Sequence, residues 1–187
     1  MYMKNKIYSA DDWIAVDSNC FTYLFQAMEI GYDPRNDSDS RLAIEKSSML
    51  KIFLHVGNLC ILPDVKDEVK QIRGQLKLNG HLLLGGTLLR NIDNLDNSQV
   101  MQYAKQYANF HSQQKDCRIL AQAEVAGLDF LLTFDQEFLD KLQDKTQSVC
   151  LSEPSNYLER LNIIAGSKPK LIPDNLNPLS AMDWWKI

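Results

Sequence analysis

The stretch KDCRILAQAEVAGLDFLLTFDQEF, residues 115–138, decides the fold class. Its first half predicts a helix that runs to Gly127, and its second half contains the apolar run FLLTF at 130–134. An apolar run of strand length without alternation is typical of a strand covered on both faces, as in parallel sheets flanked by helices. Asp116 opens the helical segment and Asp135 follows the apolar run. The stretch therefore predicts a helix followed by a buried strand, with a carboxylate at each end.

Further apolar runs and helical segments extend this pattern over most of the chain. The runs WIAV, LCIL and SVCL occupy 13–16, 59–62 and 148–151. Strands that alternate with helices predict an α/β fold, here a three-layer α/β/α arrangement with a central parallel sheet. The predicted helices lie within 18–31, 37–57, 64–76, 96–114, 116–127, 136–143 and 153–162.

Two regions depart from the alternation. The segment 76–97 contains three glycines between apolar pieces, which predicts a loop with a short strand. The segment 166–187 contains three prolines and no clear period, which predicts an extended arm after a domain at 1–165. We expect this arm to dock on its own domain or on a second copy, with both tryptophans at least half buried, because it carries seven large apolar side chains: Leu171, Ile172, Leu176, Leu179, Met182, Trp184 and Trp185.

Composition excludes several classes of protein. The 187 residues suffice for one domain, and the formal net charge of −4 argues against non-specific coating of nucleic acid. No apolar run approaches the roughly 20 residues needed to cross a bilayer, and the basic N-terminus has no apolar core of a signal peptide. We therefore expect a cytoplasmic protein without a membrane partner. The four cysteines form no CxxC pair, which favours reduced, mostly buried thiols.

Four acidic residues are placed where a site of an open parallel sheet would form. Asp17 and Asp135 follow predicted strands, and such sites lie outside the carboxyl ends of the strands. Asp116 opens a helix that leads into a strand, so its first turn belongs to the same edge. Glu68 borders the apolar stripe of the helix at 64–76, whereas Asp67 points to the opposite side.

These four carboxylates predict a metal site. Four negative charges around one space repel one another unless a cation lies between them, and oxygen ligands suit Mg²⁺ or Mn²⁺. Such an ion can activate a water and neutralise charge on a phosphoryl group, which is the chemistry of phosphodiester hydrolysis. The alternative is that Asp17, Asp116 and Asp135 are helix caps or turn residues and that Glu68 is a surface charge.

The order and placement of these residues resemble the PIN-domain family. The matching pieces are VDSN (16–19), LPDVKDEV (62–69), DCRILAQAEVAGLDFLLTFD (116–135) and LSEPSNYLERL (151–161). The resemblance covers roughly 13–161. Two features depart from a compact member of the family: the length of the segment 31–58 and the C-terminal arm.

The resemblance implies a metal-dependent ribonuclease and suggests the toxin of a VapC-type toxin–antitoxin pair. RNA would be the substrate, and an antitoxin protein and a second copy of the chain are the partners it suggests. Asn19 and Thr133 match positions whose side chains help to orient the acids. The residues that match the family's metal-binding and catalytic carboxylates are Asp17, Glu68, Asp116 and Asp135.

Other functions remain alternatives at this point. One is a catalytically silent PIN-like module that binds RNA or protein, and another is a phosphotransfer or phosphatase domain. Three histidines far apart in sequence do not predict a zinc site. Five basic residues either contact phosphates or form a solvated charged face: Lys66, Lys70, Arg73, Lys115 and Arg118.

Overall fold

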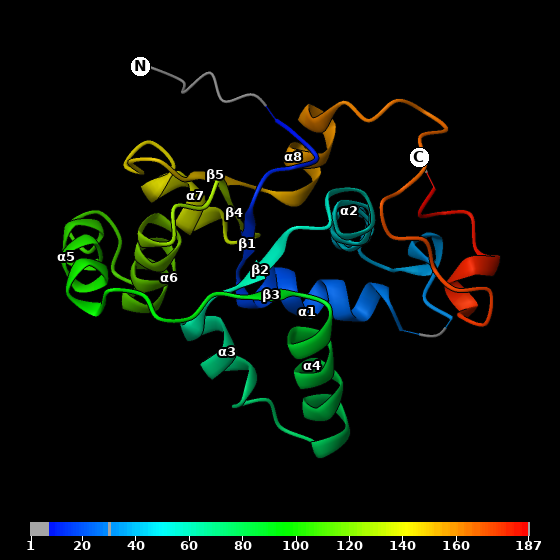
Figure 1. Ribbon diagram of the computed structural model, residues 1–187, viewed down its shortest axis with the longest axis horizontal. Helices are drawn as coiled ribbons and strands as arrows, with labels where there is room; N and C mark the ends of the chain where they lie inside the picture. Colours follow the sequence, from blue (N-terminus) through cyan, green and yellow to red (C-terminus); the bar gives the residue numbers. More distant parts are fainter. Residues whose placement is uncertain (1–7, 30, 187) are drawn as a thin grey trace.

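A parallel sheet forms the centre of the molecule. The computed structural model describes residues 8–29 and 31–186. Within them, five parallel strands form one sheet in the order β3-β2-β1-β4-β5 (Figure 1). The strands are β1 (Ile14–Val16), β2 (Leu59–Ile61), β3 (Arg90–Asn91), β4 (Phe130–Leu132) and β5 (Cys150–Ser152). All four predicted apolar runs form strands, and the predicted parallel sheet is confirmed.

Helices flank the sheet and complete three layers. In Figure 1, α2 lies on one side of the strands, and α5 and α6 lie on the other. The helix α2 packs against α1 and α8, while α5 packs against α6. The helices are α1 (Ser18–Ala27), α2 (Ser40–Val56), α3 (Pro63–Val69), α4 (Gln75–Thr87), α5 (Asn97–Tyr107), α6 (Gln114–Val125), α7 (Gln136–Leu142) and α8 (Pro154–Leu161), with short 3₁₀ turns η1 (Pro34–Asn36) and η2 (Pro178–Ala181).

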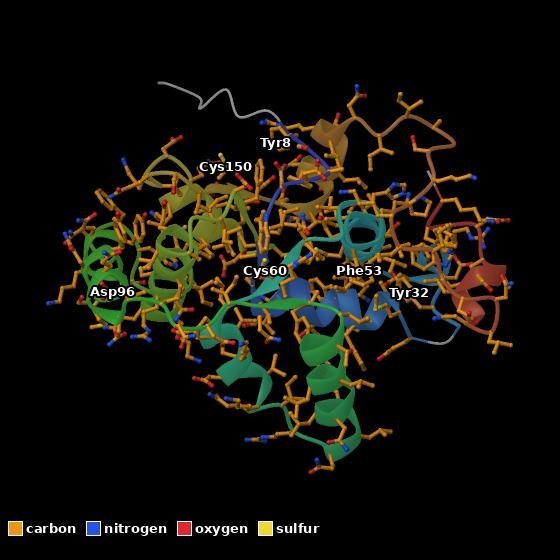
Figure 2. The ribbon with its side chains drawn as sticks, in the orientation of Figure 1. Tyr8, Tyr32, Phe53, Cys60, Asp96 and Cys150 are labelled. Carbon is orange, nitrogen blue, oxygen red and sulfur yellow. The ribbon has the colours of Figure 1, made fainter. Side chains whose placement is uncertain are left out.

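The three central strands β1, β2 and β4 are buried, as their continuous apolar sequences predict. Every residue of β1 and β4 is fully buried. In Figure 2, Phe53 of α2 and Cys60 of β2 lie in the middle of the molecule, whereas Asp96 before α5 lies at its margin. Cys20 and Cys117 are buried too and form no disulfide. Apolar packing between the sheet and the helices therefore holds in place the edge of the sheet where the strands end.

The prediction for 64–97 is wrong in two respects. The helix after β2 ends at Val69 rather than continuing to 76, and Gly74 follows with a φ of +97°. A new helix, α4, then occupies most of the segment that we predicted to be a loop. Leu76, which we expected in the apolar stripe of the first helix, is 89% exposed at the start of the second.

Close packing explains why a glycine-rich segment forms the helix α4. A Cβ atom on Gly80 would lie 2.7 Å from the ring of Phe25, and one on Gly85 would lie 3.4 Å from Phe21. His81 is buried between the same two rings, with centroids 4.2 Å from Phe25 and 5.6 Å from Phe21. The glycines therefore permit close approach of α4 to α1, whereas the sequence alone suggested turns.

Alanine substitutions in α4 should have opposite effects at two glycines. Gly80→Ala should lower the free energy of unfolding by about 1–3 kcal/mol, because the added methyl overlaps the Phe25 ring. Gly86→Ala should raise it by up to about 1 kcal/mol, because nothing lies within 4 Å and alanine favours the helix. Urea denaturation of the two variants measures both effects, and equal shifts would contradict this account.

The C-terminal arm docks on its own domain. The Leu171 amide donates a hydrogen bond to the Leu54 carbonyl of α2 at 2.9 Å. Trp185 is 5% exposed and its Nε1 donates to the Leu179 carbonyl at 2.7 Å. Trp184 is half-buried. The expected burial of both tryptophans is confirmed, although three of the seven apolar side chains stay exposed: Leu171, Ile172 and Leu176.

No helix in residues 8–29 or 31–186 combines the length and apolar character needed to cross a membrane. The N-terminal stretch that we predicted not to be a signal peptide starts outside these residues, at 1–7. The domain boundary at 165 stays a prediction.

Candidate functional site

Two of the predicted acids follow strands and cap the next helix. Asp17 comes directly after β1, and its Oδ1 accepts a hydrogen bond from the Cys20 amide of α1 at 2.6 Å. Asp135 comes three residues after the end of β4, and its Oδ1 accepts from the Phe138 amide of α7 at 3.0 Å. Both therefore are helix caps, as the alternative interpretation stated. Each cap uses one oxygen of its carboxylate.

Thr133 connects these two acids. Its hydroxyl is fully buried and donates to Oδ2 of Asp17 at 2.5 Å. The same hydroxyl oxygen accepts a hydrogen bond from the Asp135 amide at 3.1 Å. The orientation of the Asp17 carboxylate is thus fixed from both β1 and β4. Asn19, which the family resemblance suggested as a second orienting residue, is exposed.

Asp116 lies in the first turn of α6 and is held by a histidine that the sequence did not reveal. Nε2 of His111 lies 2.7 Å from Oδ2 of Asp116. His111 is 3% exposed, and its ring stacks on Phe138 of α7 with centroids 5.9 Å apart. The only available signal was its position five residues before Asp116, in the connection between α5 and α6. The histidine fixes one carboxylate oxygen and leaves Oδ1 for another ligand.

Glu68 of α3 lies beside two other acids of the candidate site. The Ser18 hydroxyl donates a hydrogen bond to Oε2 of Glu68, and Ser18 is the residue after Asp17. Lys115, the residue before Asp116, has its Nζ 3.3 Å from Oε1 of Glu68. Glu68 is therefore placed between the start of α1 and the start of α6.

The carboxylates also affect one another electrostatically. Burial raises the pKa of Asp17 to about 6, and the charge of Asp116 adds to this rise, while hydrogen bonds from Thr133 and Cys20 oppose it. The pKa of Asp116 is raised by burial and by the charges of Asp135 and Glu68, against the effect of His111. The four predicted acids thus share one region of negative potential.

The raised pKa of Asp17 should make the metal-free protein more stable at mildly acidic pH. The folded carboxyl takes up a proton near pH 6, whereas the unfolded one does so near its ordinary value of 3.8. The penalty of its burial is therefore fully present at pH 7 and is relieved as the pH falls through 6. Between pH 7 and pH 5 this carboxyl should add about 1.4 kcal/mol of stability.

Denaturation in EDTA at both pH values measures this effect, with Asp17→Asn as the matched control. Asparagine also caps helices well and carries no charge, so the variant should lose this part of the pH dependence. An identical pH dependence in the variant would contradict the assignment to Asp17.

The donor set fits a hydrated oxygen-ligated cation rather than a closed metal cage. Among residues 8–29 and 31–186, no three or more His, Cys, Asp or Glu side chains lie close enough together to share one ion. Mg²⁺ keeps several waters and is usually held through one or two carboxylates together with substrate phosphates. The carboxylates with an available oxygen, such as those of Asp116 and Asp135, suit that mode. That the four acids bind metal stays a prediction.

The basic residues around the site form ion pairs. Arg118 donates hydrogen bonds to Asp64 through Nε at 2.7 Å and Nη2 at 3.1 Å. Lys115 contacts Glu68, as described above. Lys66 and Lys70 contact Asp93 and Asp67 at 2.7 and 2.6 Å. These contacts favour the interpretation as a charged face over a row of phosphate-binding cations.

Comparisons with known proteins find a distant structural similarity. No protein-family model matches the chain, and no curated protein matches it. Among solved structures, the crystal structure of FitAcB from Neisseria gonorrhoeae is similar, with a TM-score of 0.43 and 17% sequence identity. The match covers 75% of this chain and 97% of that chain. At this level of similarity, the match says nothing about the chemistry of this chain.

Proposed function

We propose that this protein is a Mg²⁺- or Mn²⁺-dependent endoribonuclease that hydrolyses phosphodiester bonds of RNA. The observation that carries the proposal is the mutual electrostatic effect of Asp17, Glu68, Asp116 and Asp135 at the carboxyl edge of the sheet. Buried carboxylates with a raised pKa, such as those of Asp17 and Asp116, destabilise a fold in their charged form, and such groups cluster at functional sites.

The side chains of the site would have the following roles. Asp17, Asp116 and Asp135 would hold the hydrated cation, one or two of them directly and the others through its waters, with Glu68 beside them. When bound, the ion supplies an activated water and neutralises negative charge on the phosphate. Thr133 keeps Oδ2 of Asp17 oriented, and His111 does the same for Oδ2 of Asp116. The resemblance of the sequence to PIN domains adds the proposal of an antitoxin protein and a second copy of the chain as partners.

Cleavage of single-stranded RNA tests this function. Purified protein should cut an end-labelled RNA internally in Mn²⁺ or Mg²⁺, should not cut it in EDTA, and should regain activity when excess Mn²⁺ is added. An Asp116→Asn variant purified in the same way excludes a contaminating ribonuclease. Equal cleavage by this variant, or undiminished cleavage in EDTA, would show that the hydrolytic proposal is wrong.

A further inference from the structure

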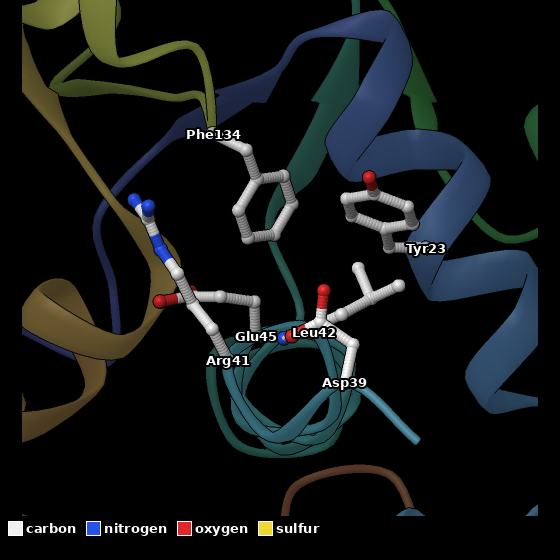
Figure 3. Close-up of a pocket in the computed structure, with 6 residues that line it drawn as sticks. All are labelled: Tyr23, Asp39, Arg41, Leu42, Glu45 and Phe134. Carbon is white, nitrogen blue, oxygen red and sulfur yellow. Dashed lines mark hydrogen bonds between the residues drawn. The ribbon is translucent and has the colours of Figure 1, made fainter. Parts of the chain in front are cut away.

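A small pocket opens beside the carboxylate site. Its volume is about 180 Å³, and Figure 3 shows Phe134 between Tyr23 and Arg41. Tyr23 of α1 and Phe134 of the β4–α7 connection meet edge to face, with ring centroids 4.7 Å apart and an interplanar angle of 65°. Both side chains are only partly buried. The pocket is lined by Tyr23, Asp39, Arg41, Leu42, Glu45 and Phe134.

The aromatic walls come from the same segments as the acids. Phe134 lies between Thr133, which donates to Asp17, and Asp135. Tyr23 lies on α1, the helix that Asp17 caps. The charge of Asp17 contributes, after burial, to the raised pKa of Tyr23. The pocket is therefore adjacent to the carboxylates, and its two aromatic residues lie on the same chain segments as Asp17 and Asp135.

The charges of the pocket argue against a phosphate as its occupant. Both carboxylate oxygens of Glu45 accept hydrogen bonds from Ser155, at 2.6 and 3.0 Å. Asp39 caps α2 through the Leu42 amide at 3.1 Å. The one cation of the lining, Arg41, already contacts Glu153 at 2.8 Å. An acidic lining repels an anion, whereas two partly exposed rings and a leucine suit a flat, uncharged aromatic group.

We propose that this pocket binds one unpaired base of RNA next to the phosphodiester that the carboxylate site cleaves. This inference rests on the proposed function, because an RNA strand bound at the carboxylate site brings its neighbouring base to the pocket. Every base has a π-face that can stack on tyrosine or phenylalanine, and a paired base of a duplex is not available for it. The substrate class is therefore single-stranded RNA.

Binding in EDTA tests the pocket separately from cleavage. Fluorescence anisotropy with short labelled RNAs should show that the wild-type protein binds a single strand more tightly than a duplex of the same sequence. Tyr23→Leu and Phe134→Leu should each raise the Kd of the single strand at least about fivefold, because they remove a stacking surface. Tyr23→Phe keeps the ring and should bind like the wild type. Trp13→Leu removes an aromatic side chain that is 40% exposed before β1, and is the matched control.

A scan of abasic positions along the RNA makes the test specific. Removal of the base that occupies the pocket should weaken RNA binding by the wild-type protein. The same removal should not weaken RNA binding by Phe134→Leu any further, because losses that share one contact are non-additive. Leucine variants that bind like the wild type, or a duplex bound as tightly as a single strand, would overturn the proposal. RNA that binds in this manner but is never cut in Mn²⁺ would support the pocket and refute hydrolysis. RNA cleavage in Mn²⁺ together with unchanged RNA binding by the leucine variants would support hydrolysis and refute the pocket.

Discussion

Replacing Asp116 by asparagine should lower the rate of metal-dependent RNA cleavage by more than about 100-fold. Removing a group that only orients a metal ligand commonly costs 10- to 100-fold in activity or affinity, so a direct ligand should cost at least that much. Asparagine keeps the size of the side chain and an oxygen for hydrogen bonding. The variant loses a buried charge whose pKa is raised by burial and by neighbouring acids, so its fold should be kept.

Single-turnover cleavage in Mn²⁺ and far-UV circular dichroism measure the two parts of this prediction. Asp67→Asn is the matched control, because Asp67 is one residue from Glu68 but faces solvent and pairs with Lys70. A variant at position 116 that is inactive and unfolded would not support a role in catalysis. A folded variant with wild-type activity would show that Asp116 does not hold the ion.

Replacing Trp185 by alanine should lower the free energy of unfolding by about 3–5 kcal/mol, the usual cost of removing a buried aromatic ring. The Trp185 side chain belongs to the core cluster, although it lies only two residues before the last residue of the sequence. Its loss also removes the hydrogen bond from Trp185 to the Leu179 carbonyl of η2 within the arm. For a protein of this size the melting temperature should fall by about 10 °C.

Leu176→Ala is the control in the same arm, because the Leu176 side chain is 94% exposed and contributes little burial. Differential scanning calorimetry of both variants, with the mass in solution measured in parallel, distinguishes arm docking from self-association. Equal melting temperatures for the two variants would show that the arm contributes nothing to stability.

The centre of the sheet was predictable from sequence because the strands β1, β2 and β4 are buried. Runs such as 13–16 and 130–134 are apolar at every position, and a strand between two helical layers requires this. The segment 76–97 was not predictable in the same way. Its glycines suggested turns, but Gly80 and Gly85 face the rings of α1, which only the folded chain brings near. Tertiary packing thus overrode local conformational preference.

The candidate site was predictable only in outline. The rule that sites lie at the carboxyl ends of parallel strands placed Asp17 and Asp135 on one edge. The contacts that orient these acids involve residues distant in sequence or in irregular connections. His111 carries no local pattern, and the contact of Ser18 with Glu68 joins residues 50 positions apart. Such partners become visible only when three-dimensional neighbours are known.

The strand order also determines when the site can exist during protein synthesis. The central strand β1 is made first, but one neighbour, β4, follows more than 100 residues later, with Ile14 opposite Phe130. Asp17 and its hydrogen-bond donor Thr133 are 116 positions apart. At translation speeds of about 5–20 residues per second, Asp17 waits roughly 6–23 seconds for this donor. A ribosome-bound chain therefore cannot assemble the acidic site before the segment 116–135 has left the exit tunnel.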